Sequence, residues 1–131
     1  MKVLVDTCIW SRVLRHKTPD AELSEKLKDL IKDGRVVMIG PIRQELLSGI
    51  PEPLQFEKLR DRLSFFEDLP LLTEYFVKAA EFCNTCRKKG VQGPTTDFLI
   101  CAISHVRKLQ IYTDDKDFSN YKKHLPIHLY K

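Results

Sequence analysis

Long hydrophobic runs and glycine are both scarce in this sequence of 131 residues, which contains only five glycines. The longest uninterrupted apolar stretch, residues 98–103, is six residues long. A membrane-spanning helix needs about 20 such residues. Asp6 interrupts the apolar stretch at the N-terminus, so the sequence shows no signal-peptide pattern. We therefore expect a cytoplasmic protein without a membrane span.

The glycine-containing motifs of several large enzyme classes are also absent. No G-x-G-x-x-G follows the first predicted strand and no G-x-x-x-x-G-K-[ST] occurs, which excludes the common dinucleotide and P-loop sites. No G-x-S-x-G nucleophile elbow is present. Cys8 stands two residues after Asp6, where a haloacid-dehalogenase-like phosphatase would carry a second aspartate. These exclusions leave phosphodiester hydrolysis by a metal-activated water as the chemistry to consider.

Cysteine is present in four copies, but not in a metal-binding arrangement. Cys83 and Cys86 form one C-x-x-C inside an apolar helical pattern, and no second pair accompanies it. A structural zinc site is almost always tetrahedral, so a single pair supplies only half of its ligands. We predict reduced thiols that pack in the core.

Charge is nearly balanced, with 22 Lys and Arg against 18 Asp and Glu, which gives a net charge of +4. The basic residues are unevenly distributed. Residues 82–96 contain Arg87, Lys88 and Lys89 but no acid, and residues 118–131 contain three lysines but no acid. Such an excess permits a polyanionic partner without requiring one, because exposed basic side chains also serve solubility.

Apolar periodicity and turn residues predict strands that alternate with helices. The strands are expected at residues 2–6, 36–40, 69–72, 109–113 and 127–129, and the helices begin at residues 7, 20, 41, 51, 73, 94 and 115. Thr73 is predicted to cap its helix, and the helix from residue 51 has an inward face that extends to Phe66. This alternation is typical of an α/β fold. We expect a single domain over residues 1–131, with a parallel β-sheet of four to five strands flanked by helices on both faces.

Carboxylates follow the predicted strands at one edge of this sheet. Asp6 ends the first strand, Glu45 lies about one helical turn beyond the second, and Asp97 is in the first turn of a later helix. Three more aspartates follow the strand at 109–113, namely Asp114, Asp115 and Asp117. Each acid alone could be a helix cap or a solvated surface residue. Together at the carboxyl edge of a parallel sheet they would repel one another, and an all-oxygen set favours Mg²⁺ or Mn²⁺.

Four short motifs occur in order along nearly the whole chain. They are D-T at residues 6–7, P-I-R-Q-E-L at 41–46, T-D-F-L-I-C-A at 96–102 and Y-T-D-D-K-D-F at 112–118. Each is weak alone because short acidic motifs are common. Together they resemble the PIN domain family, and specifically the VapC-type toxin ribonucleases of type II toxin–antitoxin systems. The resemblance implies a PIN-like fold and a Mg²⁺-dependent endoribonuclease in which Mn²⁺ can substitute.

The resemblance also implies roles for individual residues. The catalytic residues would be Asp6, Glu45, Asp97 and Asp115, and the metal ligands would be these four together with Asp117. The supporting hydroxyls would be those of Thr7 and Thr113, whereas Asp114 falls at a variable position. The candidates for binding RNA are Arg87, Lys88, Lys89 and Lys116.

Two protein partners are implied in the same way, a second copy of the chain and an antitoxin whose C-terminal segment wraps the domain. A pocket of carboxylates can also bind a guanidinium, so an antitoxin arginine could occupy it. The apolar residues that could form a groove for the antitoxin are Trp10, Leu14, Leu46, Leu47 and Ile50, unless they pack in the chain's own core.

Two other functions stay open at the level of sequence. One is a PIN-fold nuclease or RNA-binding module in RNA processing, and the other is an unrelated phosphatase or signalling domain. The complete set of acids argues against a degenerate binding module.

Overall fold

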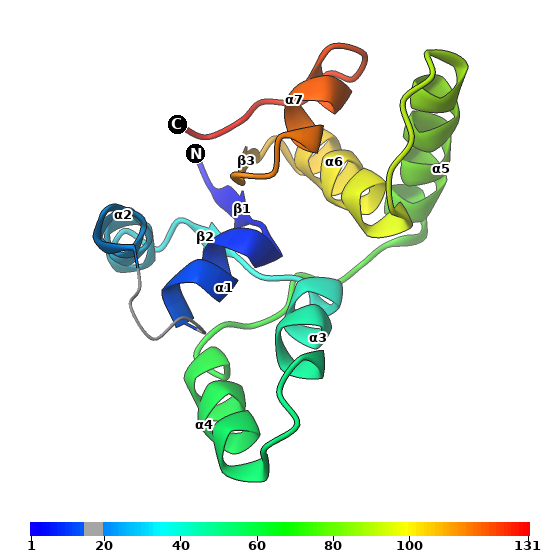
Figure 1. Cartoon of the computed structure of the whole chain (residues 1–131). Coiled ribbons are helices and arrows are strands. Elements are labelled where there is room, and N and C mark those ends of the chain that lie inside the picture. Colours follow the sequence, from blue (N-terminus) through cyan, green and yellow to red (C-terminus); the bar gives the residue numbers. More distant parts are fainter. Residues whose placement is uncertain (15–19) are drawn as a thin grey trace.

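The structure is a computed structural model that describes residues 1–14 and 20–131. Its centre is a parallel sheet, in which the described residues form three strands in the order β2–β1–β3 (Figure 1). The bounds are Val3–Val5 for β1, Val36–Val37 for β2 and Gln110–Tyr112 for β3. A parallel sheet between helices confirms the predicted α/β fold.

The middle strand, β1, sets the register of the sheet because it pairs with both neighbours. Leu4 lies opposite Val37 on β2 and opposite Ile111 on β3, and both pairings are parallel. All three side chains of β1 are fully buried, as expected for a strand whose two faces are covered. The carboxyl end of β1 therefore opens at the middle of one sheet edge.

Seven helices complete the fold within the described residues. They are α1 (Thr7–Leu14), α2 (Ala21–Lys32), α3 (Gly40–Ser48), α4 (Pro53–Leu63), α5 (Thr73–Lys88), α6 (Thr95–Arg107) and α7 (Asp117–Lys122). In Figure 1, α2 lies to the left of the strands, α5, α6 and α7 lie to the right, and α3 and α4 extend below. Within residues 1–14 and 20–131, none of these helices combines the length and the apolarity of a membrane span.

The sheet has fewer strands than the four to five predicted, because its edges are reduced to single bridges. Met38 bridges to Asp68, and its carbonyl accepts from the N–H of Leu69 at 2.8 Å. The next residue is Pro70, which has no N–H with which to continue a ladder. At the other edge Ile111 bridges to Leu129. The strands predicted at 69–72 and 127–129 are therefore reduced to single bridges, at Asp68 and at Leu129.

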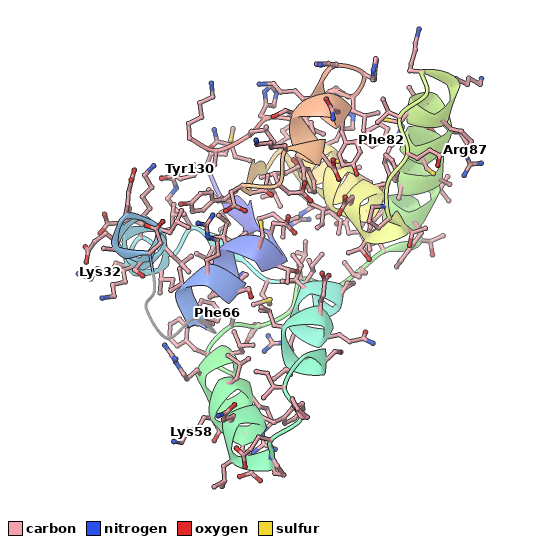
Figure 2. All side chains as sticks on the ribbon, in the orientation of Figure 1. Lys32, Lys58, Phe66, Phe82, Arg87 and Tyr130 are labelled. Carbon is pink, nitrogen blue, oxygen red and sulfur yellow. The ribbon has the colours of Figure 1, made fainter. Side chains whose placement is uncertain are left out.

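Helix boundaries also differ from the predictions in three places. Thr73 does not cap α5; the cap position is Leu72, whose backbone is extended, and Thr73 is the first helical residue. α4 ends at Leu63, so Phe66 lies beyond it, where its ring packs edge-on against Trp10 with a centroid distance of 5.1 Å (Figure 2). The last helix begins at Asp117 rather than at Asp115.

The core accounts for most of the apolar residues that the sequence left ambiguous. Trp10 and Leu46 are buried, which removes them from the predicted antitoxin groove. Leu14, Leu47 and Ile50 are half-buried and pack against the same core. All four cysteines are free, and two of them, Cys86 and Cys101, are buried, in agreement with the prediction of reduced core thiols.

Arg43 connects α3 to the C-terminal end of α4 and the segment that follows it, through hydrogen bonds and an ion pair. Its guanidinium donates to the carbonyls of Leu63 and Phe66 and forms an ion pair with Asp68 at 2.9 Å. Hydrogen bonds from a charged donor are stronger than neutral ones. Since α3 carries Glu45, these bonds fix the orientation of the helix that presents this acid.

Candidate metal centre

Asp6 lies directly after β1 at the carboxyl edge of the sheet and is 8% exposed. Its Oδ1 accepts from the N–H of Thr7 at 2.8 Å, and its Oδ2 accepts from the hydroxyl of Thr113 at 2.9 Å. The thiol of Cys8 lies 3.6 Å from the same Oδ2. Because Thr113 follows β3, the second bond joins the ends of adjacent strands and fixes the direction of the Asp6 carboxylate.

The turn between β3 and α7 brings two more carboxylates to this edge. The Thr113 hydroxyl accepts from the N–H of Asp115 at 3.0 Å, and Oδ1 of Asp115 accepts from the N–H of Asp117 at 2.9 Å. Both bonds join residues two apart, the pattern by which Thr and Asp side chains shape turns. One threonine thus positions both Asp6 and the turn that carries Asp115 and Asp117.

Asp97 approaches the same place from the first turn of α6. The residues from Phe98 to Ser104 are all buried, so the start of this helix is held firmly against the core. The hydroxyl of Tyr121, on α7, donates to Oδ2 of Asp97 at 2.7 Å. Asp97 is therefore oriented by a contact between two helices that are far apart in the sequence.

Carboxylate oxygens of Asp97, Asp115 and Asp117 all lie within 4.8 Å of one another. Asp6 adjoins this group through the Thr113 hydroxyl, which donates to Asp6 and accepts from the N–H of Asp115. In the described part of the chain, no lysine or arginine forms an ion pair with any of these four acids. We call Asp6, Asp97, Asp115 and Asp117 the acidic cluster.

The acidic cluster has perturbed protonation equilibria. Burial raises the pKa of Asp97 to about 6, and the negative charges of Asp6, Asp115 and Asp117 add to this rise, whereas the bond from Tyr121 opposes it. Burial also raises the pKa of Asp6, against the lowering effect of its hydrogen bonds. A buried carboxylate beside others of like charge is harder to ionise. Within residues 1–14 and 20–131, no lysine or arginine pairs with these carboxylates to offset the cost of ionising them.

Two of the acids named from the sequence lie outside this cluster: Glu45, which is predicted as a ligand, and Asp114, which is predicted to take no part. Glu45 is exposed on α3 and is not part of the group of close carboxylates found among the described residues. Asp114 pairs with Arg12 of α1. Partial burial would raise the pKa of Asp114, but hydrogen bonds from Cys8 and Arg12 outweigh it and hold the pKa below its ordinary value. The turn after β3 thus directs Asp114 to α1 and its two following aspartates to the cluster.

The predicted supporting and RNA-binding residues are also separated by the fold. Thr113 bonds to Asp6 through its hydroxyl, whereas Thr7 does so through its backbone N–H. Lys116 is exposed between two members of the cluster. The basic residues 87–89 are at the C-terminal end of α5, the opposite end from the start of α6 (Figure 1). Figure 2 shows the side chain of Arg87 on the side of α5 that faces away from α6.

Tyr121 is the residue at this centre that sequence reasoning missed. Its position in a short helix after the last acidic motif signals an apolar core residue, and its ring does pack against Phe98 and Phe118, with centroid distances of 5.0 and 5.2 Å. Nothing in the sequence indicates that its hydroxyl would reach Asp97. Such a contact depends on how two helices cross.

The family model of the PIN domain matches residues 3–124 of this sequence. The chain belongs to the PIN domain family. The match includes every member of the acidic cluster, and it confirms the family that the four motifs indicated. No curated protein sequence matches this chain.

Solved structures similar to this PIN domain come from several bacteria. FitAcB from Neisseria gonorrhoeae gives a TM-score of 0.81 at 20% identity, over 98% of this chain and 96% of that chain. VapBC2 from Rickettsia felis, bound to a promoter DNA fragment, gives 0.78 at 18% identity, over 99% and 98%. VapBC from Salmonella typhimurium, bound to DNA, gives 0.77 at 18% identity, over 99% and 97%. At these identities the similarity shows a shared fold.

The raised pKa of Asp97 predicts how the stability of this PIN domain depends on pH in metal-free buffer. A folded-state pKa of about 6, against an ordinary value of 3.8, means that the folded state binds more protons between these values. Stability from this group is therefore gained as pH falls through 6 and lost as pH rises. We expect Asp97→Asn to have a higher melting temperature than the wild type at pH 7 in EDTA. The difference between the two melting temperatures should decrease toward pH 5.

Differential scanning fluorimetry of the wild type and Asp97→Asn measures this gap. Asp114→Asn is the control, because the pKa of Asp114 is lowered by its partners. That variant should melt below the wild type by an amount that stays constant between pH 7 and pH 5. A gap for Asp97→Asn that does not change with pH would contradict the predicted repulsion.

Proposed function

We propose that this PIN domain is the toxin of a toxin–antitoxin pair and acts as a Mg²⁺-dependent endoribonuclease. The observation that carries the proposal is the acidic cluster, in which β1, α6 and the β3–α7 turn bring four carboxylates together without a basic partner among the described residues. The sequence motifs and the family membership support the same activity.

A divalent cation fits the residues at this centre. The donors are all carboxylate oxygens, the set that Mg²⁺ and Mn²⁺ prefer over zinc. The oxygens of Asp97, Asp115 and Asp117 lie within 4.8 Å of one another, which leaves room for a shared ion. Asp6, Asp97, Asp115 and Asp117 would hold the ion. When bound, such an ion neutralises charge on a phosphate and lowers the pKa of a coordinated water.

The other residues of the centre would hold the ligands in place or accept the proton of the attacking water. Thr113 holds Asp6 and the Asp115 turn in place through its two hydrogen bonds. Glu45 is exposed outside the cluster, so it is available to complete the site through water or to accept the proton of the attacking water. Asp115 is the second candidate for that proton. Asp114 takes no part, because it pairs with Arg12.

An RNA phosphate would reach the cluster past Lys116, which is exposed between Asp115 and Asp117. A lysine there can offset the repulsion between the acids and the phosphate. Lys88 and Lys89 are at the C-terminal end of α5 (Figure 1), whereas Arg87 lines a hollow together with Gly93. We assign the main RNA contact to Lys116.

The proposed protein partner is an antitoxin, and the proposed location is the cytoplasm. One similar structure is described as a toxin–antitoxin complex from Klebsiella pneumoniae, with a TM-score of 0.68 at 16% identity over 90% of this chain and 91% of that chain. The cluster suits a guanidinium as well as a cation, since arginine binds carboxylates in a bidentate manner. An antitoxin arginine at this position would block both the metal and the RNA.

The proposed nuclease can be tested by comparing two neighbouring aspartates. Asp115→Asn removes a member of the cluster, whereas Asp114→Asn removes only the partner of Arg12. We expect the first to reduce cleavage of a fluorescent RNA by about 100-fold or more, in line with losses typical of metal-site residues and their supports. The second should retain most of the activity. EDTA should abolish cleavage, and Mg²⁺ or Mn²⁺ should restore it.

Cleavage that survives exhaustive chelation would exclude the metal mechanism. A greater loss in Asp114→Asn than in Asp115→Asn would show that the acids of the turn have been assigned to the wrong roles. RNA binding without cleavage by the wild type would instead favour an RNA-binding module.

The toxin role predicts a growth phenotype. Expression of the wild type in a bacterial host should arrest growth, and Asp6→Asn should not, because Asp6 is the cluster member at the end of the central strand. Co-expression of a short reading frame adjacent to this gene should restore growth. The measurements are optical density and the integrity of total RNA. Unimpaired growth with active soluble wild type would place the nuclease in RNA processing instead.

A homodimer is proposed on the exposed apolar surface of α5. Leu72, Phe76 and Val77 are 47%, 51% and 55% exposed. Phe76 also lines a hollow of about 380 Å³ between α5 and α6. Contiguous apolar surface of this kind often marks an interface. The family resemblance implies a homodimer, and we place its interface on this surface.

Phe76→Glu should convert the dimer to a monomer in size-exclusion chromatography with light scattering, because it would place a charge in the apolar interface. Phe65→Glu is the matched control, since Phe65 is 75% exposed in the segment just after α4. It should leave the dimer intact. A wild-type monomer at all concentrations, or equal effects of both variants, would contradict this interface.

A further inference from the structure

The hydroxyl of Tyr121 is the one polar atom of an otherwise apolar side chain at the acidic cluster. The residue is fully buried, and its ring packs against the rings of Phe98 and Phe118. Phenylalanine would make the same ring contacts. The hydroxyl therefore needs an explanation of its own, because burying a polar group has a cost unless it is hydrogen-bonded.

The partner of this hydroxyl is a carboxylate and not a backbone group. It donates to Oδ2 of Asp97 at 2.7 Å, a length typical of a charge-assisted hydrogen bond. Asp97 lies at the start of α6, and within the described residues no other side chain or backbone N–H donates to its carboxylate. The phenol is thus the contact that fixes the orientation of the Asp97 carboxylate within the cluster.

Gly93 leaves the space that the phenol of Tyr121 occupies. A Cβ atom at position 93 would lie 2.0 Å from the hydroxyl oxygen of Tyr121 and 2.9 Å from its Cζ. The backbone of Gly93 does not itself require glycine, because positive φ angles occur only at Gly34 and Gly90 among the described glycines. The missing side chain at position 93 therefore leaves room for the hydroxyl to reach Asp97.

We propose that Tyr121 is a positioning residue for the metal centre, and that Gly93 is glycine because the Tyr121 hydroxyl occupies the space of a side chain there. The hydroxyl holds the Asp97 carboxylate in the orientation that binds the cation. This inference rests on the proposed metal-dependent function, and it adds two residues to the centre that lie outside the acidic motifs.

A comparison with Tyr112 separates this role from general packing. The hydroxyl of Tyr112 is also buried, but it has no hydrogen-bond partner among the described residues. Its ring packs against Tyr130, with a centroid distance of 5.1 Å. Tyr112→Phe therefore makes the same chemical change as Tyr121→Phe in a buried tyrosine that meets the cluster only through its backbone carbonyl, which accepts from the N–H of Asp6 at 2.9 Å and is kept in the variant.

The first test measures Mn²⁺ binding to the full chain by electron paramagnetic resonance, together with the melting temperature in EDTA. We expect Tyr121→Phe to weaken Mn²⁺ binding by about 10-fold or more, the loss typical when a hydrogen bond to a metal ligand is removed. Tyr112→Phe should bind Mn²⁺ as the wild type does. A purely structural role for Tyr121 would lower the melting temperature and leave Mn²⁺ affinity unchanged.

The second test uses Gly93→Ala alone and combined with Tyr121→Phe. The added methyl group should displace the phenol from Asp97, so Gly93→Ala should weaken Mn²⁺ binding about as much as Tyr121→Phe does. The double variant should then bind about as well as either single variant, because both remove the same hydrogen bond. If the two substitutions acted independently, the double variant would lose Mn²⁺ affinity by the product of the two single losses.

The outcomes separate this inference from the proposed function. Wild type that binds no Mn²⁺ would overturn the metal centre itself, and the positioning role with it. Wild type that binds Mn²⁺ and cleaves RNA, with unchanged Mn²⁺ affinity in Tyr121→Phe, would overturn only the role of Tyr121. Multiplicative losses in the double variant would overturn the link between Gly93 and the phenol.

Discussion

Repulsion among carboxylates is the constraint on which the rest of this structure depends. Four acids from three separate segments meet at the carboxyl edge of a short parallel sheet, and no side chain of the described residues neutralises them. Like charges at this distance oppose one another and oppose burial. The fold must therefore hold them in place by other means. The fully buried strand β1 and the buried stretch of α6 supply the rigidity.

Hydroxyl groups do the finer positioning at this edge. Thr113 donates to Asp6 and accepts from the backbone of Asp115, so one side chain aligns the end of β1 with the turn after β3. Tyr121, on α7, donates to the carboxylate of Asp97 and so aligns α7 with the start of α6. Hydrogen bonds to a carboxylate favour its charged form and oppose the effect of burial on its pKa. These hydroxyls therefore keep the cluster both oriented and available to a cation.

The small sheet is sufficient because helices provide most of the core. Only three strands form within the described residues, and the outer pairings are single bridges, one of them limited by Pro70. The central strand nevertheless has both neighbours in parallel register. Parallel register is what matters for the centre, because it places the residues after β1 and β3 side by side. Further strands would not move Asp6 or Asp115 closer together.

The sequence by itself determined the alternation of strands and helices, and it showed which strand ends and helix starts carry acids, because apolar periodicity and turn residues are local properties. It also indicated the family, through four motifs in order. The resemblance set Asp114 apart from Asp115, but only the tertiary structure gave the physical reason and placed Glu45 outside the cluster. Asp114 and Asp115 are adjacent, yet one pairs with Arg12 and the other joins the cluster. The contact of Tyr121 with Asp97 was likewise invisible in the sequence, since it depends on the crossing of α6 and α7 and on the space left at Gly93.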